Sequence, residues 1–135
     1  MKLEVGMKAT QTKTVTIEDI KKYAEITGDY NPLHFDSDFA SKTKFGKLVA
    51  QGGITSGLLN ALVAMKLPGP GTVFLNQQLQ YTAPVFIGDT ITASAEIIKL
   101  HPTKPVTTIN VEIKKESDGE SVLQGECVCY TFQVE

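Results

Sequence analysis

Hydrophobic positions recur with helical spacing in the first quarter of the chain. Thr16 is a residue type favoured at the N-cap of a helix, and Glu18 and Asp19 suit the positive end of the helix dipole. Gly28 is the residue type that most often follows the last helical turn. The positions that share one face between Thr16 and Gly28 are Ile17, Ile20, Tyr23, Ala24 and Thr27. The pattern therefore predicts an amphipathic helix that Gly28 ends.

A second segment, residues 52–66, is apolar on most faces and interspersed with small residues. A helix that is hydrophobic nearly all round should be buried. The proline and glycine residues at 67–71 stop this helix. Between the two helices, the sequence predicts a short helical piece over residues 37–42 and a loop over residues 43–48.

From residue 73 onward, apolar positions alternate with a period of two, as they do in β-strands. The alternating sets are Val73, Leu75, Gln77, Leu79 and Tyr81; Ile91, Ala93, Ala95 and Ile97; Thr107, Ile109, Val111 and Ile113; and a final run over residues 122–132. Turns at 88–89, 101–102 and 117–119 separate these runs, and no helix lies between them. Residues 6–15 form an extended lead-in. We therefore expect one α+β domain over residues 1–135, in which an antiparallel sheet covers the buried helix.

The charge balance narrows the range of partners. The net charge is −2 and the pI is about 5.7, whereas a nucleic-acid-binding protein would show a basic stripe. All thirteen basic residues are lysines, so a phosphate would be met by lysine or backbone N–H groups, without guanidinium forks. No stretch approaches the ~18 apolar residues of a membrane span. We expect neither a nucleic-acid partner nor a membrane partner.

The two cysteines, Cys127 and Cys129, would face the same side of a strand. A bridge between them would be strained, and a metal site would need more ligands than two cysteines and two histidines easily supply. We expect them to be small, reduced core residues, which suits a reducing compartment. The N-terminus lacks the apolar run of a signal peptide. We therefore expect a cytoplasmic protein with no metal and no cofactor.

The densest group of turn-forming residues is 28–34, Gly-Asp-Tyr-Asn-Pro-Leu-His. Pro32 pushes Asn31 out of the α region, so the preceding helix cannot continue. At neutral pH, Asp29 offers a carboxylate and His34 a mostly neutral imidazole. The rigid turn could bring both around one water, one group taking a proton while the other orients or returns one. These residues alone leave a structural alternative open, in which Asp29 caps a turn and His34 packs nearby.

Residues 23–34, Tyr-Ala-Glu-Ile-Thr-Gly-Asp-Tyr-Asn-Pro-Leu-His, with Ala40 six positions further on, resemble the signature of the MaoC-like, (R)-specific enoyl-CoA hydratase family. Later similarities are Leu-Pro-Gly at 67–69 and the strand junction at 81–90. The resemblance implies the hotdog fold, in which a curved antiparallel sheet wraps around a long central helix. It also implies a hydro-lyase that reversibly adds water, syn, to a trans-2-enoyl thioester of coenzyme A or acyl carrier protein. The product would be an (R)-3-hydroxyacyl thioester.

In the family, the Asp and the His of the motif together bind and activate the water, and in this chain they are Asp29 and His34. Asn31 falls on the Asn of the motif, and we expect it to brace the loop or to contact the catalytic pair. The resemblance therefore favours the catalytic interpretation of Asp29 and His34 over the structural one.

The thioester oxygen gains negative charge in this reaction and needs preorganised donors. The start of the helix predicted over residues 52–66 supplies exposed N–H groups and a positive dipole end, and glycines let a substrate approach the backbone. We expect the amide of Gly52 or Gly53 to be the main donor; the alternative is that the glycines only allow tight packing. The family commonly has His-Gly-Met where this chain has Gln51-Gly52-Gly53. How the thioester is held, and which chain lengths fit, therefore stay open.

Three other functions are compatible with this scaffold. One is the same chemistry carried out as a 3-hydroxyacyl-carrier-protein dehydratase of fatty-acid synthesis. Another is an acyl-CoA thioesterase, but such enzymes usually place an acid on the central helix, and residues 52–66 contain none. The third is a non-catalytic acyl-CoA-binding module, which has no reason to keep both Asp29 and His34. Open sheet edges need pairing, and the resemblance points to a homodimer or higher homo-oligomer.

Two further groups of residues have less specific interpretations. Lys42, Lys44 and Lys47 precede the predicted buried helix. They could meet the phosphates of coenzyme A or a carrier-protein helix, or form a solvated face. His101, directly before Pro102, is expected to be a solvated turn residue.

Overall fold

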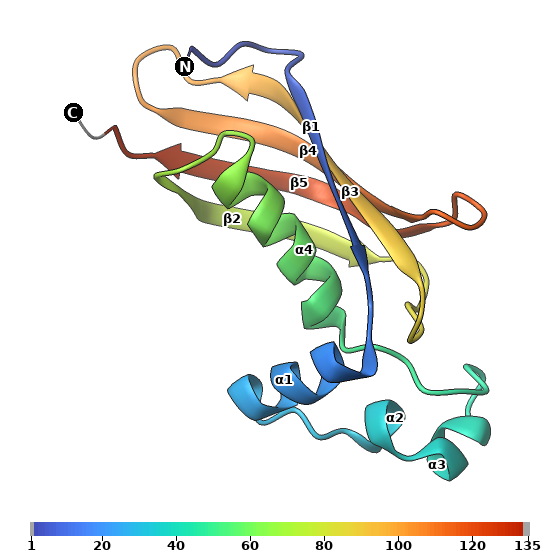
Figure 1. Ribbon diagram of the computed structural model, residues 1–135. Coiled ribbons are helices and arrows are strands. Elements are labelled where there is room, and N and C mark those ends of the chain that lie inside the picture. Colours follow the sequence, from blue (N-terminus) through green and yellow to red (C-terminus); the bar gives the residue numbers. More distant parts are fainter. Residues whose placement is uncertain (1, 134–135) are drawn as a thin grey trace.

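Residues 2–133 form five strands and four helices in the computed structural model, which describes that part of the chain. The longest helix, α4, lies across the sheet, and three shorter helices gather at the N-terminal end of α4 (Figure 1). In chain order the elements are β1 (Lys8–Thr14), α1 (Ile17–Thr27), α2 (Pro32–Phe35), α3 (Ser37–Ser41), α4 (Gly52–Met65), β2 (Thr72–Tyr81), β3 (Thr90–Leu100), β4 (Val106–Lys115) and β5 (Ser121–Thr131).

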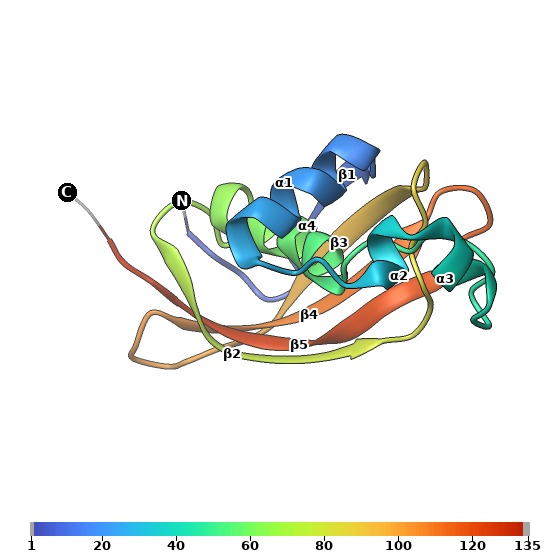
Figure 2. The same ribbon diagram turned by 90° about the horizontal axis from the view of Figure 1, so that it is seen from below.

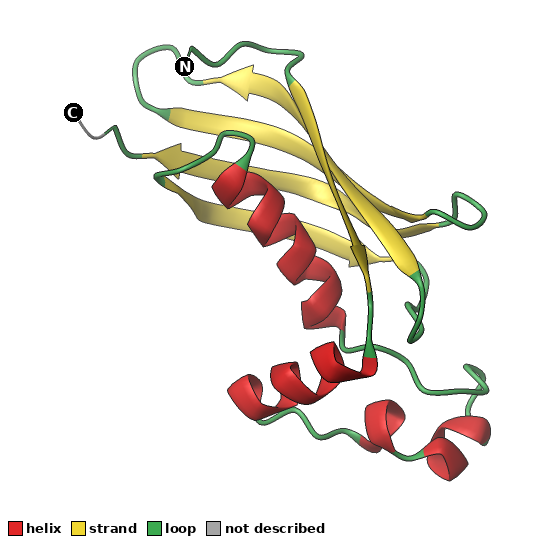
Figure 3. Cartoon of the chain, viewed as in Figure 1, coloured by secondary structure: helices red, strands yellow, loops and turns green. Residues whose placement is uncertain are grey.

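The five strands form one antiparallel sheet in the order β1-β3-β4-β5-β2. The sheet curves, and α4 lies on its concave side (Figure 2). Helix α4 crosses the sheet, and the three shorter helices lie beyond the ends of the strands (Figure 3). The core between α4 and the sheet is aliphatic and includes Leu59, Leu62, Ile97, Ile109 and Ile113. The predicted hotdog arrangement, a curved antiparallel sheet around a central helix, is confirmed.

Helix α1 begins and ends at the predicted residues. The Thr16 hydroxyl accepts a hydrogen bond from the Asp19 amide, and the Asp19 carboxylate accepts one from the Thr16 amide. These reciprocal bonds form a capping box. Gly28 has a φ of 82°, and its N–H donates to the Ala24 carbonyl. Glycine enters this left-handed region without a Cβ penalty, so Gly28 fixes the point at which the next loop begins.

The apolar sequence of helix α4 predicts burial on nearly all faces, but the helix is buried on one face only. The sheet and α1 cover the face that carries Ile54, Thr55, Leu58, Leu59, Leu62 and Val63. Asn60 and Met65 are exposed, and Met65 retains 67% of its surface. The prediction that the helix is buried is therefore correct for one side only, and within residues 2–133 nothing covers Met65.

Strand β2 departs from the alternation predicted for it. A register shift lies between Phe74 and Asn76 in the pairing with β5. Because a bulge inserts one extra residue, the side chains on either side of it change faces. Phe74 therefore packs against the core, while Val73 and Leu75 are 47% and 58% exposed. The prediction that Val73 and Leu75 share one face with Leu79 was wrong, because Leu79 packs against the core and the other two do not.

Two further elements differ from the sequence prediction. The lead-in at 6–15 contains strand β1, which pairs with β3 along its whole length. The turn-rich segment at 28–34 ends in a new helical turn, α2, with Pro32 at its first position. Proline is favoured there because the first helical N–H has no intrahelical partner. Helices α3 and α4 end within one residue of their predicted ends.

Both cysteines lie on β5 and are free and fully buried. Burial raises the pKa of the Cys127 thiol to about 11 and that of Cys129 to about 12. Thiols of this kind react slowly, because the thiolate is the nucleophile. The prediction that they are small core residues is confirmed.

Candidate active site

The loop between α1 and α2 is braced by hydrogen bonds between near neighbours. The Asp29 carboxylate accepts from the Asn31 amide at 3.2 Å. The Asn31 side-chain oxygen accepts from the Leu33 amide at 3.0 Å and so caps α2. The His34 amide donates to the Asn31 carbonyl at 2.9 Å. Asn31 therefore braces the loop, which is one of the two roles predicted for it.

His34 is buried and has a defined ring orientation. Its Nδ1 lies 2.7 Å from the carbonyl oxygen of Val49. A carbonyl can only accept, so Nδ1 carries the proton and the neutral ring keeps a lone pair on Nε2. Nε2 lies 3.8 Å from Oδ2 of Asp29. The Asp29 side chain is 39% exposed and the His34 side chain 9%, so the pair opens to solvent on the Asp29 side.

The separation of 3.8 Å is too long for a direct hydrogen bond between the two side chains. In the neutral tautomer, Nε2 and Oδ2 are also both acceptors. A water oxygen can lie ~2.8 Å from each and donate one hydrogen to each. Asp29 and His34 are thus brought together as predicted, in a geometry suited to holding one water between two proton acceptors.

Residues 51–53 form the other part of the candidate site, at the start of α4. Gln51 is the N-cap residue, but its side chain makes no cap hydrogen bond. Its Nε2 instead donates to the Ile20 carbonyl of α1 at 3.0 Å, and its buried Oε1 has no hydrogen-bond partner among residues 2–133. The amides of Gly52 and Gly53 belong to the first helical turn, where N–H groups have no intrahelical acceptor.

The two glycines have different surroundings. A Cβ built on Gly53 would overlap the hydroxyl and ring of Tyr23 on α1. A Cβ built on Gly52 would lie 3.2 Å from the ring of Tyr81 at the end of β2. The Tyr23 hydroxyl therefore occupies the space of a side chain at position 53. This explains in physical terms why glycine stands there in place of the methionine common in the family.

Each glycine also lines a different cavity. Gly52 lines one of about 380 Å³ together with Lys44 and Tyr81. Gly53 lines one of about 490 Å³ together with Tyr23. The two amides could not be distinguished from the sequence, because the residues that make their surroundings differ, Tyr23 and Tyr81, lie far away in the chain.

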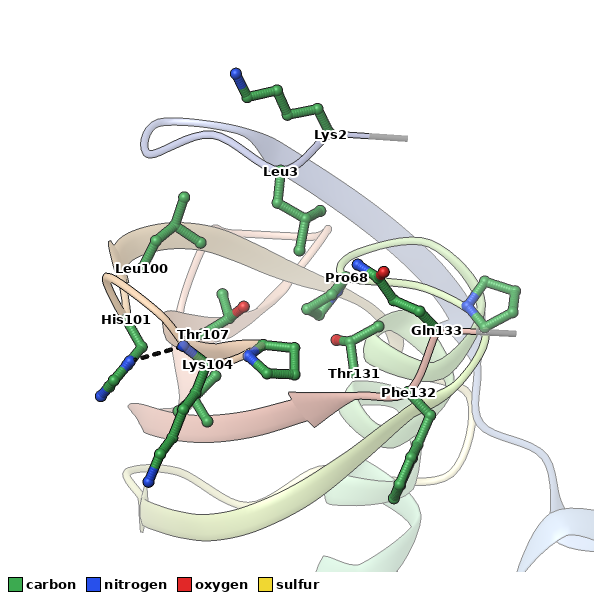
Figure 4. A pocket seen from close by; sticks show the side chains of 13 residues that line it. Lys2, Leu3, Pro68, Leu100, His101, Lys104, Thr107, Thr131, Phe132 and Gln133 are labelled. Atoms are coloured by element: carbon green, nitrogen blue, oxygen red, sulfur yellow. Dashed lines mark hydrogen bonds between the residues drawn. The ribbon is translucent and has the colours of Figure 1, made fainter. Parts of the chain in front are cut away.

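A larger cavity, of about 670 Å³, lies elsewhere (Figure 4). It is lined by residues such as Leu3, Pro68 and Leu100, near the turn between β3 and β4 (Figure 4). That turn is at the end of the sheet away from α2 (Figure 1). His101 is exposed there, and its Nδ1 accepts from the amides of the turn, as expected for a turn residue. This cavity contains none of the candidate site residues.

Val49 is the residue of the site that the sequence did not reveal. It acts through its carbonyl oxygen, which any residue type would supply, so its identity carries no signal. Among residues 2–133, no group of three or more His, Cys, Asp or Glu side chains could hold a metal ion. None of the helices in that part of the chain is long and apolar enough to cross a membrane.

Comparisons with known proteins identify the family to which the chain belongs. Residues 2–121 match the family model described as MaoC like domain. A 3-hydroxybutyryl-CoA dehydratase of Methylorubrum extorquens is 38% identical over 126 residues, which cover 90% of this chain and 80% of that protein. An (R)-specific enoyl-CoA hydratase of Aeromonas caviae is 36% identical over 126 residues, 93% of each chain. The solved (R)-hydratase from A. caviae involved in PHA biosynthesis superposes with a TM-score of 0.90 at 35% identity, covering 96% of this chain and 98% of that one. The chain therefore belongs to the MaoC-like domain family.

Proposed function

We propose that this protein is an (R)-specific enoyl-CoA hydratase, which reversibly converts a trans-2-enoyl thioester and water into an (R)-3-hydroxyacyl thioester. The observation that carries the proposal is the position of His34 Nε2, 3.8 Å from Asp29 Oδ2 with its ring anchored on Val49. Similarity to relatives described as hydratases and dehydratases supports it.

In the proposed reaction, a water held by Asp29 and His34 attacks the β-carbon of the enoyl thioester. A C–O bond forms while one O–H bond of the water breaks, and the proton passes to Asp29 or His34. The π electrons of the double bond move through the α-carbon to the thioester oxygen, giving an enolate. The enolate then takes a proton at the α-carbon from the same side of the substrate, which restores the pair and gives syn addition.

The thioester oxygen would be stabilised by an amide at the start of α4. Gly52 is the better candidate, because the Tyr23 hydroxyl and ring already press against Gly53. Anchoring of His34 on Val49, three positions before Gly52, keeps the water-activating groups close to this helix end. No cofactor or metal enters these steps, and the thioester of coenzyme A or acyl carrier protein is the substrate.

The test is an assay with crotonyl-CoA. We expect the absorbance of the conjugated enoyl thioester to fall without release of free thiol. The product should resist oxidation by an (S)-specific 3-hydroxyacyl-CoA dehydrogenase. Release of free coenzyme A in step with the fall in absorbance would contradict the proposal and favour a thioesterase, although α4 carries no acidic side chain. The dehydratase of carrier-protein thioesters is the same chemistry in reverse, and the crotonyl thioester of an acyl carrier protein tests it in the same assay.

We further propose that the protein is a cytoplasmic homodimer or higher homo-oligomer. The unpaired edge of β2, with exposed Val73 and Leu75, and the exposed Met65 on α4 support an oligomer. Exposed edges and apolar patches of this kind are commonly covered by another chain. Two free cysteines suit a reducing compartment. A monomeric mass at micromolar concentration would contradict the oligomer.

A further inference from the structure

The cavity at Gly52 extends from the start of α4 to the loop before it. Gly52 of α4 lines it, and so do Lys44 and Phe45 of the loop. Its volume is about 380 Å³, within the size range of small-molecule sites. Among the residues of the described part of the chain, 2–133, Lys44 is the only charged one that lines this cavity. The cavity is therefore lined at one place by the first turn of α4, whose amides have no intrahelical acceptor, and at another by the ammonium-bearing side chain of Lys44.

The loop before α4, which contains Lys44 and Phe45, makes backbone contacts with the connection between β2 and β3. The Ala50 amide donates to the Val85 carbonyl at 2.7 Å, and Val49 forms an isolated antiparallel bridge with Phe86. These contacts hold the loop against Pro84 and Val85, which also line the cavity. The position of Lys44 at the cavity therefore rests on contacts to a second segment, and not on the loop alone.

Two lysines of this loop lie over aromatic rings. Lys47 Nζ is 4.4 Å from the ring centroid of Phe86, and Lys44 Nζ is 5.8 Å from that of Phe45. Within residues 2–133, no carboxylate comes within 4.0 Å of either ammonium group. A ring face orients a cation but leaves its positive charge unbalanced.

Lys115 shows the contrasting arrangement on the same ring. Its Nζ lies 5.0 Å from the centroid of Phe86 but is also 3.3 Å from Asp89 and 3.4 Å from Glu120. Its charge is therefore balanced by carboxylates. Lys44, by contrast, lines the cavity, and Lys47 lies over the ring of Phe86, the residue after the lining residue Val85. No carboxylate within residues 2–133 balances either charge.

We propose that Lys44 and Lys47 bind the phosphate of the 4′-phosphopantetheine arm that coenzyme A and acyl carrier protein share. The arm occupies the cavity, with its thioester at Gly52 and its phosphate at the lysines. The phosphate of the arm is negatively charged in coenzyme A and in acyl carrier protein, and it would balance charge that no carboxylate balances at these two lysines within residues 2–133. Lysine is the only strongly basic residue type in the chain. The inference rests on the proposed function, since it places the thioester of that reaction.

The experiment compares thioesters that differ in one phosphate. The substrates are crotonyl-pantetheine and crotonyl-4′-phosphopantetheine, with crotonyl-CoA and a crotonyl-acyl carrier protein as the two natural sources of the arm. The variants are Lys44→Gln, Lys47→Gln and the double variant. Lys104→Gln is the matched control, because Lys104 lines the large cavity at the far end of the sheet (Figure 4).

We expect the double variant to raise KM about tenfold for the three phosphate-bearing thioesters, with kcat unchanged. KM for crotonyl-pantetheine should stay within about twofold of wild type, and added salt should shrink the difference between the two proteins. Lys104→Gln should behave as wild type.

Three results would overturn the assignment. One is an equal rise of KM for the phosphate-free thioester, and another is no rise for any thioester. The third is a loss confined to crotonyl-CoA, which would assign the lysines to its nucleotide phosphates. If wild type hydrates none of the thioesters, the proposed function fails. Calorimetric binding of crotonyl-4′-phosphopantetheine to wild type and the double variant then still tests the lysines.

Discussion

The loop at residues 28–34 and the start of α4 at residues 51–53 supply the two parts of the candidate site, and different kinds of contact hold them. In the loop, side-chain hydrogen bonds join residues two positions apart, such as Asp29 with Asn31. At the start of α4, the side-chain amide of Gln51 donates a hydrogen bond to the Ile20 carbonyl, 31 positions away. The Tyr23 hydroxyl and ring lie where a side chain at position 53 would be. The backbone of the first part is held mainly by contacts within its own sequence, and the His34 ring is anchored outside it, on Val49. The second part receives its geometry from the rest of the fold.

This difference explains why one part of the site follows the family motif and the other does not. In a motif held by hydrogen bonds between near neighbours, each bond needs a particular residue of the motif. A substitution there removes a bond that a residue elsewhere in the chain cannot replace. At position 53, a change from methionine to glycine can be matched by a tyrosine hydroxyl on another helix. The substitutions below test whether the two parts depend on local and long-range contacts as described.

Among the substitutions that add no charge, the largest effect on stability is expected for Gly53→Ala. Its new methyl group would overlap the Tyr23 hydroxyl and ring, and overpacking of this kind lowers the free energy of unfolding by ~1–3 kcal/mol. Gly57→Ala is the matched control on the same helix, because no atom lies within 4 Å of a Cβ built there. Alanine should stabilise that position by up to ~1 kcal/mol. Denaturant midpoints measure both, and equal midpoints for the two variants would refute the close approach of Tyr23.

Asn31→Ala should have an intermediate effect. It removes the oxygen that accepts from the Leu33 amide and caps α2, which costs ~1 kcal/mol of unfolding free energy. Hydration should slow as well, because α2 carries His34. Asn31→Ser keeps an N-cap oxygen and should recover most of both losses in the same assays. A variant Asn31→Ala with wild-type stability and rate would show that the loop is held by other contacts.

Gln51→Leu should have the smallest effect. It removes the hydrogen bond to Ile20 but also removes the buried Oε1 that has no partner among residues 2–133. These changes oppose each other, so the unfolding free energy should stay within ~1 kcal/mol of wild type. Gln51→Glu should destabilise far more, because a buried carboxylate would face the Ile20 carbonyl. Thermal unfolding of the pair measures this contrast, and similar losses in both would contradict it.

The elements predicted well from the sequence are those whose determinants are local. The capping residues of α1 and the periodicity of β3 and β4 are examples. Strand β1 was read only as an extended lead-in, because its side chains are mostly polar on both faces. It is held instead by pairing with β3, including hydroxyl contacts between Thr12 and Thr92 and between Thr14 and Thr90. The bulge near Leu75 likewise depends on the register with β5, which no local pattern of β2 specifies.

In the candidate site, too, the features with local determinants could be predicted and those that depend on distant contacts could not. Asp29, Asn31 and His34 could be singled out because turn chemistry and a motif act within a few residues. The anchoring of His34 on Val49 could not, because a backbone carbonyl leaves no trace in the residue type and lies 15 positions away. The preference for Gly52 over Gly53 required knowing that Tyr23 packs against the start of α4.

The most direct test of the proposed water-activating pair is the hydration rate of Asp29→Asn and His34→Asn with crotonyl-CoA. Both substitutions remove a proton acceptor, and the asparagine at position 34 keeps an N–H group that can donate to Val49. We predict that each lowers kcat/KM by roughly 100- to 10,000-fold without changing the free energy of unfolding by more than about 1 kcal/mol. The double variant should be little slower than the slower single variant, because both groups act on one water. A wild-type rate in either single variant would contradict the account.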